Sequence, residues 1–188
     1  MLPSKRQTPI KIIEILNILL VLTSVSLCSV LMLLRIPGME LLDTNPNWLL
    51  IWVVAWGTKY NIWQSAIAGF TLGCIYDGIG LSSPSHILGF VLAGVLTSAL
   101  QKQKYIGEDF ISIAFIVFFM TILAESVYAV QYTRVYSLNP GQVFIKYKQI
   151  VIISAIITSL WSPAFYYPFS IWHNQMKKRA RKETNLID

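Results

Sequence analysis

Three acidic residues interrupt the apolar stretches of this sequence and give the first indication of a polar site. Glu14, Asp77 and Glu125 each lie inside a run of apolar residues. A carboxylate is costly in hydrocarbon, so such a residue faces the interior of a helix bundle or a partner group. Lys11 lies within one helical turn of Glu14, so a local ion pair can account for the charge of Glu14. Asp77 and Glu125 therefore remain as the candidates for a function.

The two remaining carboxylates are expected at a similar depth. Each follows the start of its apolar run, at Ile62 or Phe110, by about 15 residues. On the topology derived below, both runs cross from inside to outside, which places both carboxylates in the outer third of the membrane. The cations able to reach this level are Arg35, His86, Arg134 and Lys148. We therefore hypothesise a polar cluster on the outer side.

The sequence carries no complete catalytic or metal-binding pattern. Tyr76-Asp77 resembles the first aspartate motif of intramembrane aspartyl proteases, but the second aspartate is missing, and nothing else supports a dyad of Asp77 with Glu125. His86 and His173 are predicted at opposite membrane faces, so they cannot share a metal. No nucleophile elbow, phosphate loop or dinucleotide fingerprint is present. We expect neither an enzyme nor a bound cofactor.

Composition predicts the class of protein. Of 188 residues, 55% are hydrophobic and 13% charged, against about 25% charged in soluble domains. The mean hydropathy of +0.58 excludes both a water-soluble globule and a disordered chain. Cys28 and Cys74 lie in apolar runs and form no disulfide framework. The prediction is an all-α, polytopic integral membrane protein.

Six apolar runs are candidates for membrane-spanning helices, each of which needs roughly 20 apolar residues. The second is short, since Trp48–Thr58 has 11 residues and Pro46–Tyr60 has 15. Pro163 and Pro168 are expected to break the last run. The longest polar connection, roughly Gln131–Lys148, is too short to fold alone. We predict a single domain, 1–188, whose basic tail is 173–188 and whose spans are about 12–34, 46–60, 62–80, 86–100, 110–130 and 149–172.

The distribution of basic residues decides whether the second run spans. If it does, 11 of the 15 Lys and Arg residues lie inside and four lie outside, namely Arg35, Arg134, Lys146 and Lys148. If it does not, six lie inside and nine outside. The positive-inside rule favours the first arrangement. We therefore predict six transmembrane helices, with both termini and the Lys102–Lys104 loop in the cytoplasm and with the first helix as an uncleaved anchor.

Three further patterns each allow two interpretations. The basic run Lys177–Lys182 indicates a topology determinant that contacts anionic lipids, or else a face for acidic partners or RNA; we expect no nucleic acid. Aromatic residues flank two spans and indicate interfacial belts, or else stacking on a flat ligand: Trp48, Trp52, Trp56, Tyr60 and Trp63, and Trp161, Tyr166, Tyr167 and Trp172. Two stripes of small residues indicate close helix packing, or else a transport path: Ala66, Gly69 and Gly73, and Gly89, Ala93 and Gly94.

Several short motifs follow one another in a characteristic order: Arg35-Ile36-Pro37-Gly38-Met39-Glu40-Leu41-Leu42, Pro46-Asn47-Trp48 continuing to Trp56, Trp63-Gln64, Ala68-Gly69, Gly73-Cys74-Ile75-Tyr76-Asp77-Gly78 and Pro84-Ser85-His86-Ile87-Leu88-Gly89. This order resembles the rod shape-determining protein MreD family. Leu100–Ile106 and Glu108-Asp109-Phe110 extend the likeness in a form similar to cyanobacterial members. The resemblance covers roughly residues 33–131, whereas the N-terminal helix and the last 50 residues match only in hydropathy and in the basic tail.

This resemblance implies a non-enzymatic component of the cell-elongation machinery in the plasma (inner) membrane. Members of the family associate with the bitopic protein MreC and link the actin-like MreB filament to peptidoglycan synthases of the RodA and penicillin-binding classes. The fold implied is similar to the substrate-binding subunit of ECF vitamin transporters, also with six helices. The alternative function is therefore such a ligand-binding transport subunit. Asp77 and Gly89 carry over by motif, whereas Glu125 rests on its burial cost alone.

The surroundings of Asp77 predict how its charge is satisfied. Its carboxylate should accept hydrogen bonds from the 82–89 turn and hold the flanking helices in register, or pair with a cation such as Arg35 or His86. A contact with a ligand or a partner is the other interpretation. Gly78 and Gly80 would let the backbone bend at this point.

Overall fold

The computed structural model describes residues 8–34, 38–40, 44–80, 83–102, 110–137 and 139–184. Arg35 lies outside the described residues, and so do the side chains of Glu14, His173 and Lys177–Lys182. The described elements are helices, which confirms the all-α class: α1 (Thr8–Leu33), α2 (Trp48–Gly57), α3 (Ile62–Gly80), α4 (Ile87–Lys102), α5 (Phe110–Val135) and α6 (Pro140–Thr184). Each helix overlaps one predicted apolar run.

Among the described residues, three helices are long and apolar enough to cross a membrane. The suitable segments are Ile15–Leu33 in α1, Ile111–Val135 in α5 and Tyr147–Trp172 in α6. Trp48–Gly57 and Ile87–Gln101 are apolar but shorter. Because most of the α1 segment is exposed apolar surface, it suits a lipid environment and not water. These helices support the predicted membrane class.

The short helix α2 lies at the centre of the fold. All of its residues except Trp56 are buried, so it is enclosed by other helices. The Asn47 side chain caps its first turn by accepting a hydrogen bond from the Leu50 N–H at 3.1 Å. The Asn47 N–H in turn donates to the Thr158 hydroxyl of α6 at 3.1 Å. At about 1.5 Å per residue, α2 is roughly 15 Å long, about half the thickness of a bilayer core.

The belt interpretation of the tryptophans in α2 is wrong for two of them. Trp48 and Trp52 are each only 4% exposed. Trp48 packs against Trp161 and Phe165 of α6, with ring centroids 6.1 and 5.3 Å apart. The reason is that α2 is surrounded by protein, so its large side chains fill the core. Trp63, at the start of α3, is by contrast 82% exposed, as an interfacial residue would be.

Small residues bring α3 and α4 into close contact. A Cβ atom at Gly69 would lie 2.5 Å from the Phe90 carbonyl oxygen, and one at Gly73 would lie 2.6 Å from the Ile87 Cα. From the other helix, a Cβ at Gly94 would lie 2.6 Å from the Ser65 carbonyl oxygen. Only glycine fits at these positions. The packing interpretation of the two stripes is therefore the one that the structure supports.

The connection between the last two helices is shorter than the sequence predicts. The expected polar segment Gln131–Lys148 is helical at both ends, because α5 continues to Val135 and α6 begins at Pro140. Proline is favoured at a first helical position, where its missing N–H would be unpaired anyway. The long polar loop is therefore a prediction that the structure contradicts.

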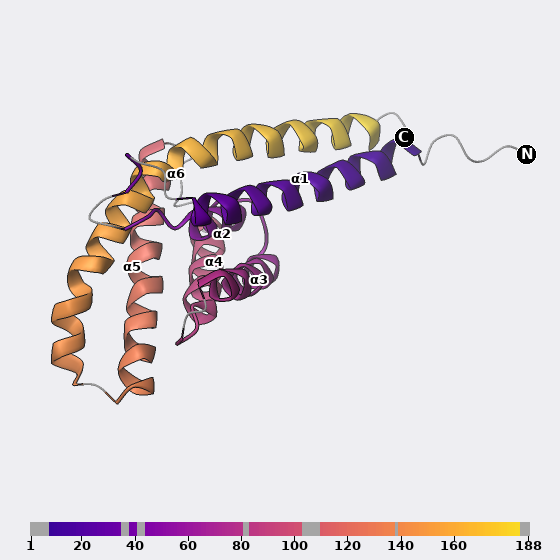
Figure 1. The fold of residues 1–188 in the computed structure, drawn as a ribbon. Coiled ribbons are helices and arrows are strands. Elements are labelled where there is room, and N and C mark those ends of the chain that lie inside the picture. Colours follow the sequence, from indigo (N-terminus) through magenta and orange to yellow (C-terminus); the bar gives the residue numbers. More distant parts are fainter. Residues whose placement is uncertain are drawn as a thin grey trace, which may run out of the picture.

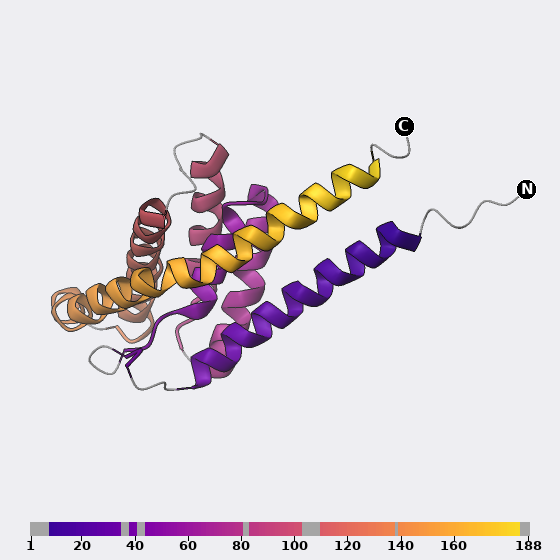
Figure 2. The same cartoon turned by 90° about the horizontal axis from the view of Figure 1, so that it is seen from above.

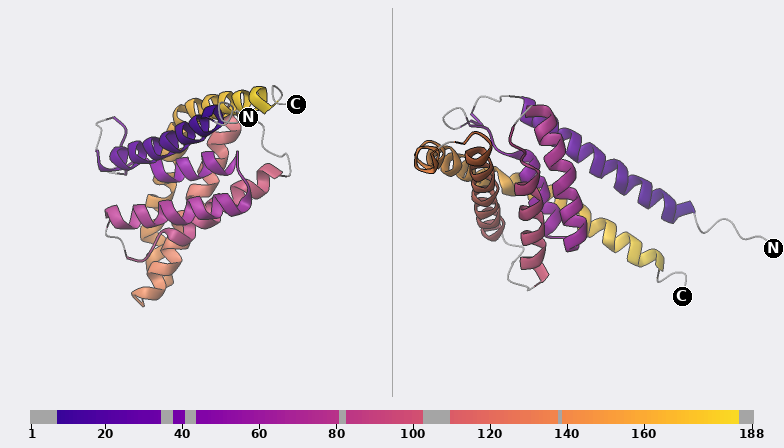
Figure 3. Two further views of the ribbon diagram at one scale, coloured as in Figure 1. Left: turned by 90° about the vertical axis from the view of Figure 1, so that its right-hand side faces the viewer. Right: turned by 90° about the horizontal axis from the view of Figure 1, so that it is seen from below.

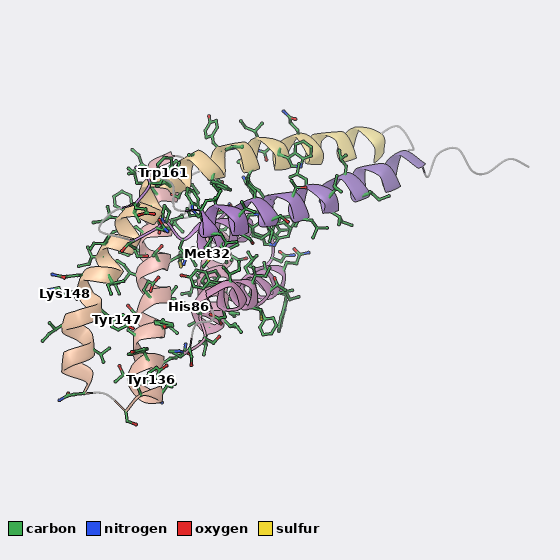
Figure 4. The ribbon with its side chains drawn as sticks, in the orientation of Figure 1. Met32, His86, Tyr136, Tyr147, Lys148 and Trp161 are labelled. Atoms are coloured by element: carbon green, nitrogen blue, oxygen red, sulfur yellow. The ribbon has the colours of Figure 1, made fainter. Side chains whose placement is uncertain are left out.

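The sequence predicts that Pro163 and Pro168 break the last helix. In the structure the helix is continuous and bends instead. α6 runs for 45 residues through Pro163 and Pro168. Pro163 cannot donate to the Ser159 carbonyl, and the Ser162 hydroxyl donates to that oxygen at 2.8 Å in its place. The orange and yellow halves of α6 take different directions, and the bend lies near Trp161 (Figures 1 and 4).

The bend in α6 lets one helix pack in two places. Its N-terminal half lies antiparallel to α5, and its C-terminal half runs beside α1 (Figures 1 and 2). The start of α1 and the end of α6 therefore lie at the same end of the molecule. The α5–α6 pair is steeply inclined to α1 (Figures 1 and 3). The turn that carries the candidate site residues joins α3 to α4.

Candidate functional site at the turn between α3 and α4

Asp77 sits in the last turn of α3 and binds the start of α4. The Ser85 hydroxyl donates to its Oδ2 at 2.6 Å, and the His86 backbone N–H donates to both carboxylate oxygens at 2.9 and 3.0 Å. The Ser85 oxygen also accepts from the Ile87 N–H at 3.1 Å. A side chain of α3 and a serine thus satisfy free N–H groups at the start of α4. The expected hydrogen bonds between Asp77 and this turn are present.

The His86 side chain adds a further contact to the same carboxylate. Its Nδ1 lies 2.9 Å from Asp77 Oδ1, and the side chains are 11% and 16% exposed respectively. Either an imidazolium or a neutral ring protonated at Nδ1 can donate here. The predicted pairing of Asp77 with His86 is therefore geometrically present, and Arg35, the other cation proposed for this role, lies outside the described residues.

Aromatic rings enclose His86 on two sides. Its ring stacks on Tyr128 of α5, with centroids 4.1 Å apart and planes 15° from parallel. Tyr76 of α3 lies against it at 4.5 Å. The histidine directly precedes α4 and contacts side chains of α3 and α5, so it links the start of α4 to both of these helices.

A ladder of tyrosines continues from His86 along α5. Tyr128, Tyr132 and Tyr136 recur every four residues and so share one helix face. Tyr147 of α6 packs on Tyr132 with ring centroids 5.3 Å apart. The Tyr136 hydroxyl donates to the Ser83 carbonyl at 3.3 Å, which links the end of α5 to the α3–α4 turn. His86, Tyr136 and Tyr147 are labelled in Figure 4.

Glu125 precedes Tyr128 by three residues, on the same face of α5, and approaches α6. It is partly buried, and its carboxyl is within hydrogen-bonding reach of the buried Ser154 hydroxyl. Both carboxylates lie in the neighbourhood of Tyr76 and Tyr128. The two carboxylates that the sequence selects thus share aromatic neighbours, although each is bound by its own hydroxyl partner.

The two candidate glycines behave differently. Gly89 is buried where α4 crosses α5, and a Cβ there would lie 2.9 Å from the Ala124 carbonyl oxygen. Gly78 is exposed, lies within α3 and has no atom within 4 Å of a Cβ position. Gly89 is therefore needed for close packing, whereas packing within this chain does not require Gly78. The expected bend at Gly78 and Gly80 is absent, since both are helical.

The geometry of this turn suits a structural role. The Asp77 carboxylate accepts from hydroxyl, backbone and ring donors of one short segment, an arrangement that fixes two helices in register. No group of three His, Cys, Asp or Glu side chains that could hold a metal occurs in the described ranges. Sequence reasoning missed the tyrosine ladder, and it predicted the turn that binds Asp77 without singling out Ser85 as a donor. The four-residue spacing of Tyr128, Tyr132 and Tyr136 was the signal that could have revealed the ladder.

Comparison of the chain with protein-family models, with curated proteins and with solved structures finds no match.

Proposed function

We propose that this protein is a non-enzymatic, six-pass component of the cell-elongation machinery of MreD type in the inner membrane. In this role it helps to link the actin-like MreB filament and an MreC-like partner to peptidoglycan synthases of the RodA and penicillin-binding classes. The ordered motifs of residues 33–131 carry the proposal. Its central motif, from Gly73 to Gly89, is the segment in which Asp77 binds the following turn. A carboxylate whose oxygens already accept hydrogen bonds from its own chain favours a structural role over a catalytic one.

The proposed topology has six spans with both termini in the cytoplasm. The count of 11 basic residues inside against four outside supports it. The position of α2 supports it too, because a helix enclosed by protein can cross with fewer apolar residues than one exposed to lipid. On this topology the α3–α4 turn and the α5–α6 connection face outward together, in agreement with the Tyr136–Ser83 hydrogen bond.

Reporter fusions test this topology. A cytoplasmic reporter fused after Tyr60, between α2 and α3, and another fused after Lys182 should both be active, because six spans return the chain to the cytoplasm at both points. A periplasmic reporter at the same two positions should be inactive. As a control, a fusion after Asn139 should give the reverse pattern. Periplasmic activity after Tyr60 would show that α2 does not cross.

Depletion of the protein tests its function. A rod-shaped or elongated cell that loses the protein should round or swell, because wall synthesis is no longer guided along the long axis. Microscopy and the incorporation of a fluorescent wall precursor measure this, and re-expression of the intact chain is the control. Normal shape and normal wall incorporation after complete depletion would contradict the proposal.

The ECF-type alternative makes a different prediction. A transport subunit should copurify with a stoichiometric small molecule and depend on an ATPase pair. Mass spectrometry of the purified protein together with inspection of the neighbouring genes distinguishes the two functions. Neighbours encoding an actin-like protein and an MreC-like protein favour the elongation role.

A further inference from the structure

A groove of about 630 Å³ lies between α5 and the N-terminal half of α6. Its walls run from Ile122 to Arg134 on α5 and from Val143 to Ile152 on α6. The groove opens to the side of the helix pair, since Val130 and Ile152 in its walls are 58% and 42% exposed. Both helices carry segments suited to cross a membrane, so this opening faces lipid.

Two cations lie at one end of the groove. Arg134 comes one residue before the end of the apolar segment Ile111–Val135, and Lys148 comes one residue after the start of Tyr147–Trp172. Because α5 and this half of α6 are antiparallel, both cations lie at the same end of the pair (Figure 1). Ile122 precedes Arg134 by 12 residues, roughly 18 Å along α5. The groove is therefore charged at the membrane surface and apolar at hydrocarbon depth.

The positive charges of this end are not compensated within the described part of the chain. Neither Arg134 nor Lys148 forms an ion pair or a side-chain hydrogen bond with a described residue, and no acidic residue lines the groove. The carboxyl of Glu125, on the same helix, is engaged by Ser154 instead. On the proposed topology this end faces outward, where the positive-inside rule gives basic residues no role in orientation. The two cations are available for an anion outside the chain.

The order of charge and apolar surface indicates an anionic lipid as the occupant. A phospholipid carries its phosphate at the level of the membrane surface and its acyl chains beneath, as the groove carries its cations and its apolar walls. The planar guanidinium of Arg134 suits a phosphate particularly well, because it can donate two parallel hydrogen bonds. A helix of a partner protein would fit only if it carried an acidic residue at this level.

We propose that the α5–α6 groove binds one anionic phospholipid. Its phosphate contacts Arg134 and Lys148, and an acyl chain lies along the apolar walls toward Ile122. This site is separate from the attraction of lipid to the basic tail at the other end of α6. It rests on the proposed topology only for the leaflet, which is the outer one, and it does not depend on the role in cell elongation.

Native mass spectrometry of the full chain tests the charged end. Protein taken from phosphatidylcholine nanodiscs with a minor fraction of phosphatidylglycerol should retain one phosphatidylglycerol. Arg134→Gln and Lys148→Gln should each weaken this retention about fivefold, which corresponds to the ~1 kcal/mol that one cation contributes near a membrane surface. Glycerol phosphate, which has no acyl chain, should not displace the lipid. A wild-type protein that retains phosphatidylcholine equally well would overturn the proposal.

Lys59→Gln is the matched control for charge. It removes one cation at the start of the α2–α3 connection, outside the groove, and should leave retention unchanged. Equal losses for Lys59→Gln and Lys148→Gln would show that only the net charge matters, and the proposal would be wrong. Circular dichroism confirms that each variant is folded.

Ala129→Leu tests the apolar part of the groove without changing any charge. Ala129 lines the groove, so the larger side chain occupies space that the acyl chain needs and should weaken retention of phosphatidylglycerol. Full retention by this variant would overturn the proposal. If retention is full and recovery of an MreC-like partner in a pull-down is lost, the groove holds a partner helix and not a lipid.

Discussion

Replacing Gly69 with alanine is expected to lower the free energy of unfolding by about 1–3 kcal/mol, because the added methyl group overpacks the crossing of α3 and α4. Its Cβ would lie 2.5 Å from the Phe90 carbonyl oxygen and 2.8 Å from the Val91 Cα. Both are backbone atoms, so the strain can be relieved only by moving the helices apart. Thermal unfolding or titration with a denaturing detergent in micelles measures the change.

Gly78→Ala is the matched control on the same helix. A Cβ at Gly78 meets no atom within 4 Å, so alanine is tolerated there and can stabilise the helix by up to about 1 kcal/mol. Equal destabilisation by the two substitutions would show that the close approach at Gly69 is not what holds α3 against α4. If Gly78→Ala instead leaves stability intact but prevents recovery of an MreC-like partner, Gly78 belongs to an interface.

The glycines show how far the sequence could predict this fold. The apolar runs located the six helices of the described residues. The small-residue stripe containing Gly69 and Gly73 predicted a close crossing, because only glycine permits such contact. Sequence alone could not tell which helix would be enclosed. The apolar, Trp-rich composition of α2 suits a membrane interface and a protein core equally, and tertiary packing decides between them. The belt interpretation of Trp48 and Trp52 failed for this reason.

The polar residues were predictable to a different degree. The cost of a carboxylate at membrane depth selected Asp77 before its partners were known. The local spacing to Ser85 and His86 was enough to predict the turn that satisfies it. The packing of Tyr147 against Tyr132, and the approach of Ser154 to Glu125, depend on how α5 and α6 pair. Such contacts between distant segments leave no local signal in the sequence.

Loss of the Asp77 carboxylate should be the other large effect. Asp77→Ala is expected to lower the free energy of unfolding by about 2–3 kcal/mol, since it leaves the Ser85 hydroxyl and the His86 N–H without their acceptor. Ser85→Ala, which removes only one donor, should cost about 1 kcal/mol and serves as the control for a partial loss. Thermal unfolding of the purified variants gives the order of the effects.

Asp77→Asn separates the structural role of this residue from a contact with a partner. The asparagine side-chain oxygen can still accept from the His86 N–H, so this variant should recover most of the stability lost in Asp77→Ala. If hydrogen bonding to the turn is what matters, Asp77→Ala should lower both the stability and the recovery of an MreC-like partner in a pull-down. Asp77→Asn should restore both together, and Ser85→Ala should lower both only in part. An Asn variant with full stability that no longer recovers the partner would contradict the structural account, because the charge of Asp77 would then act at an interface and not within the turn.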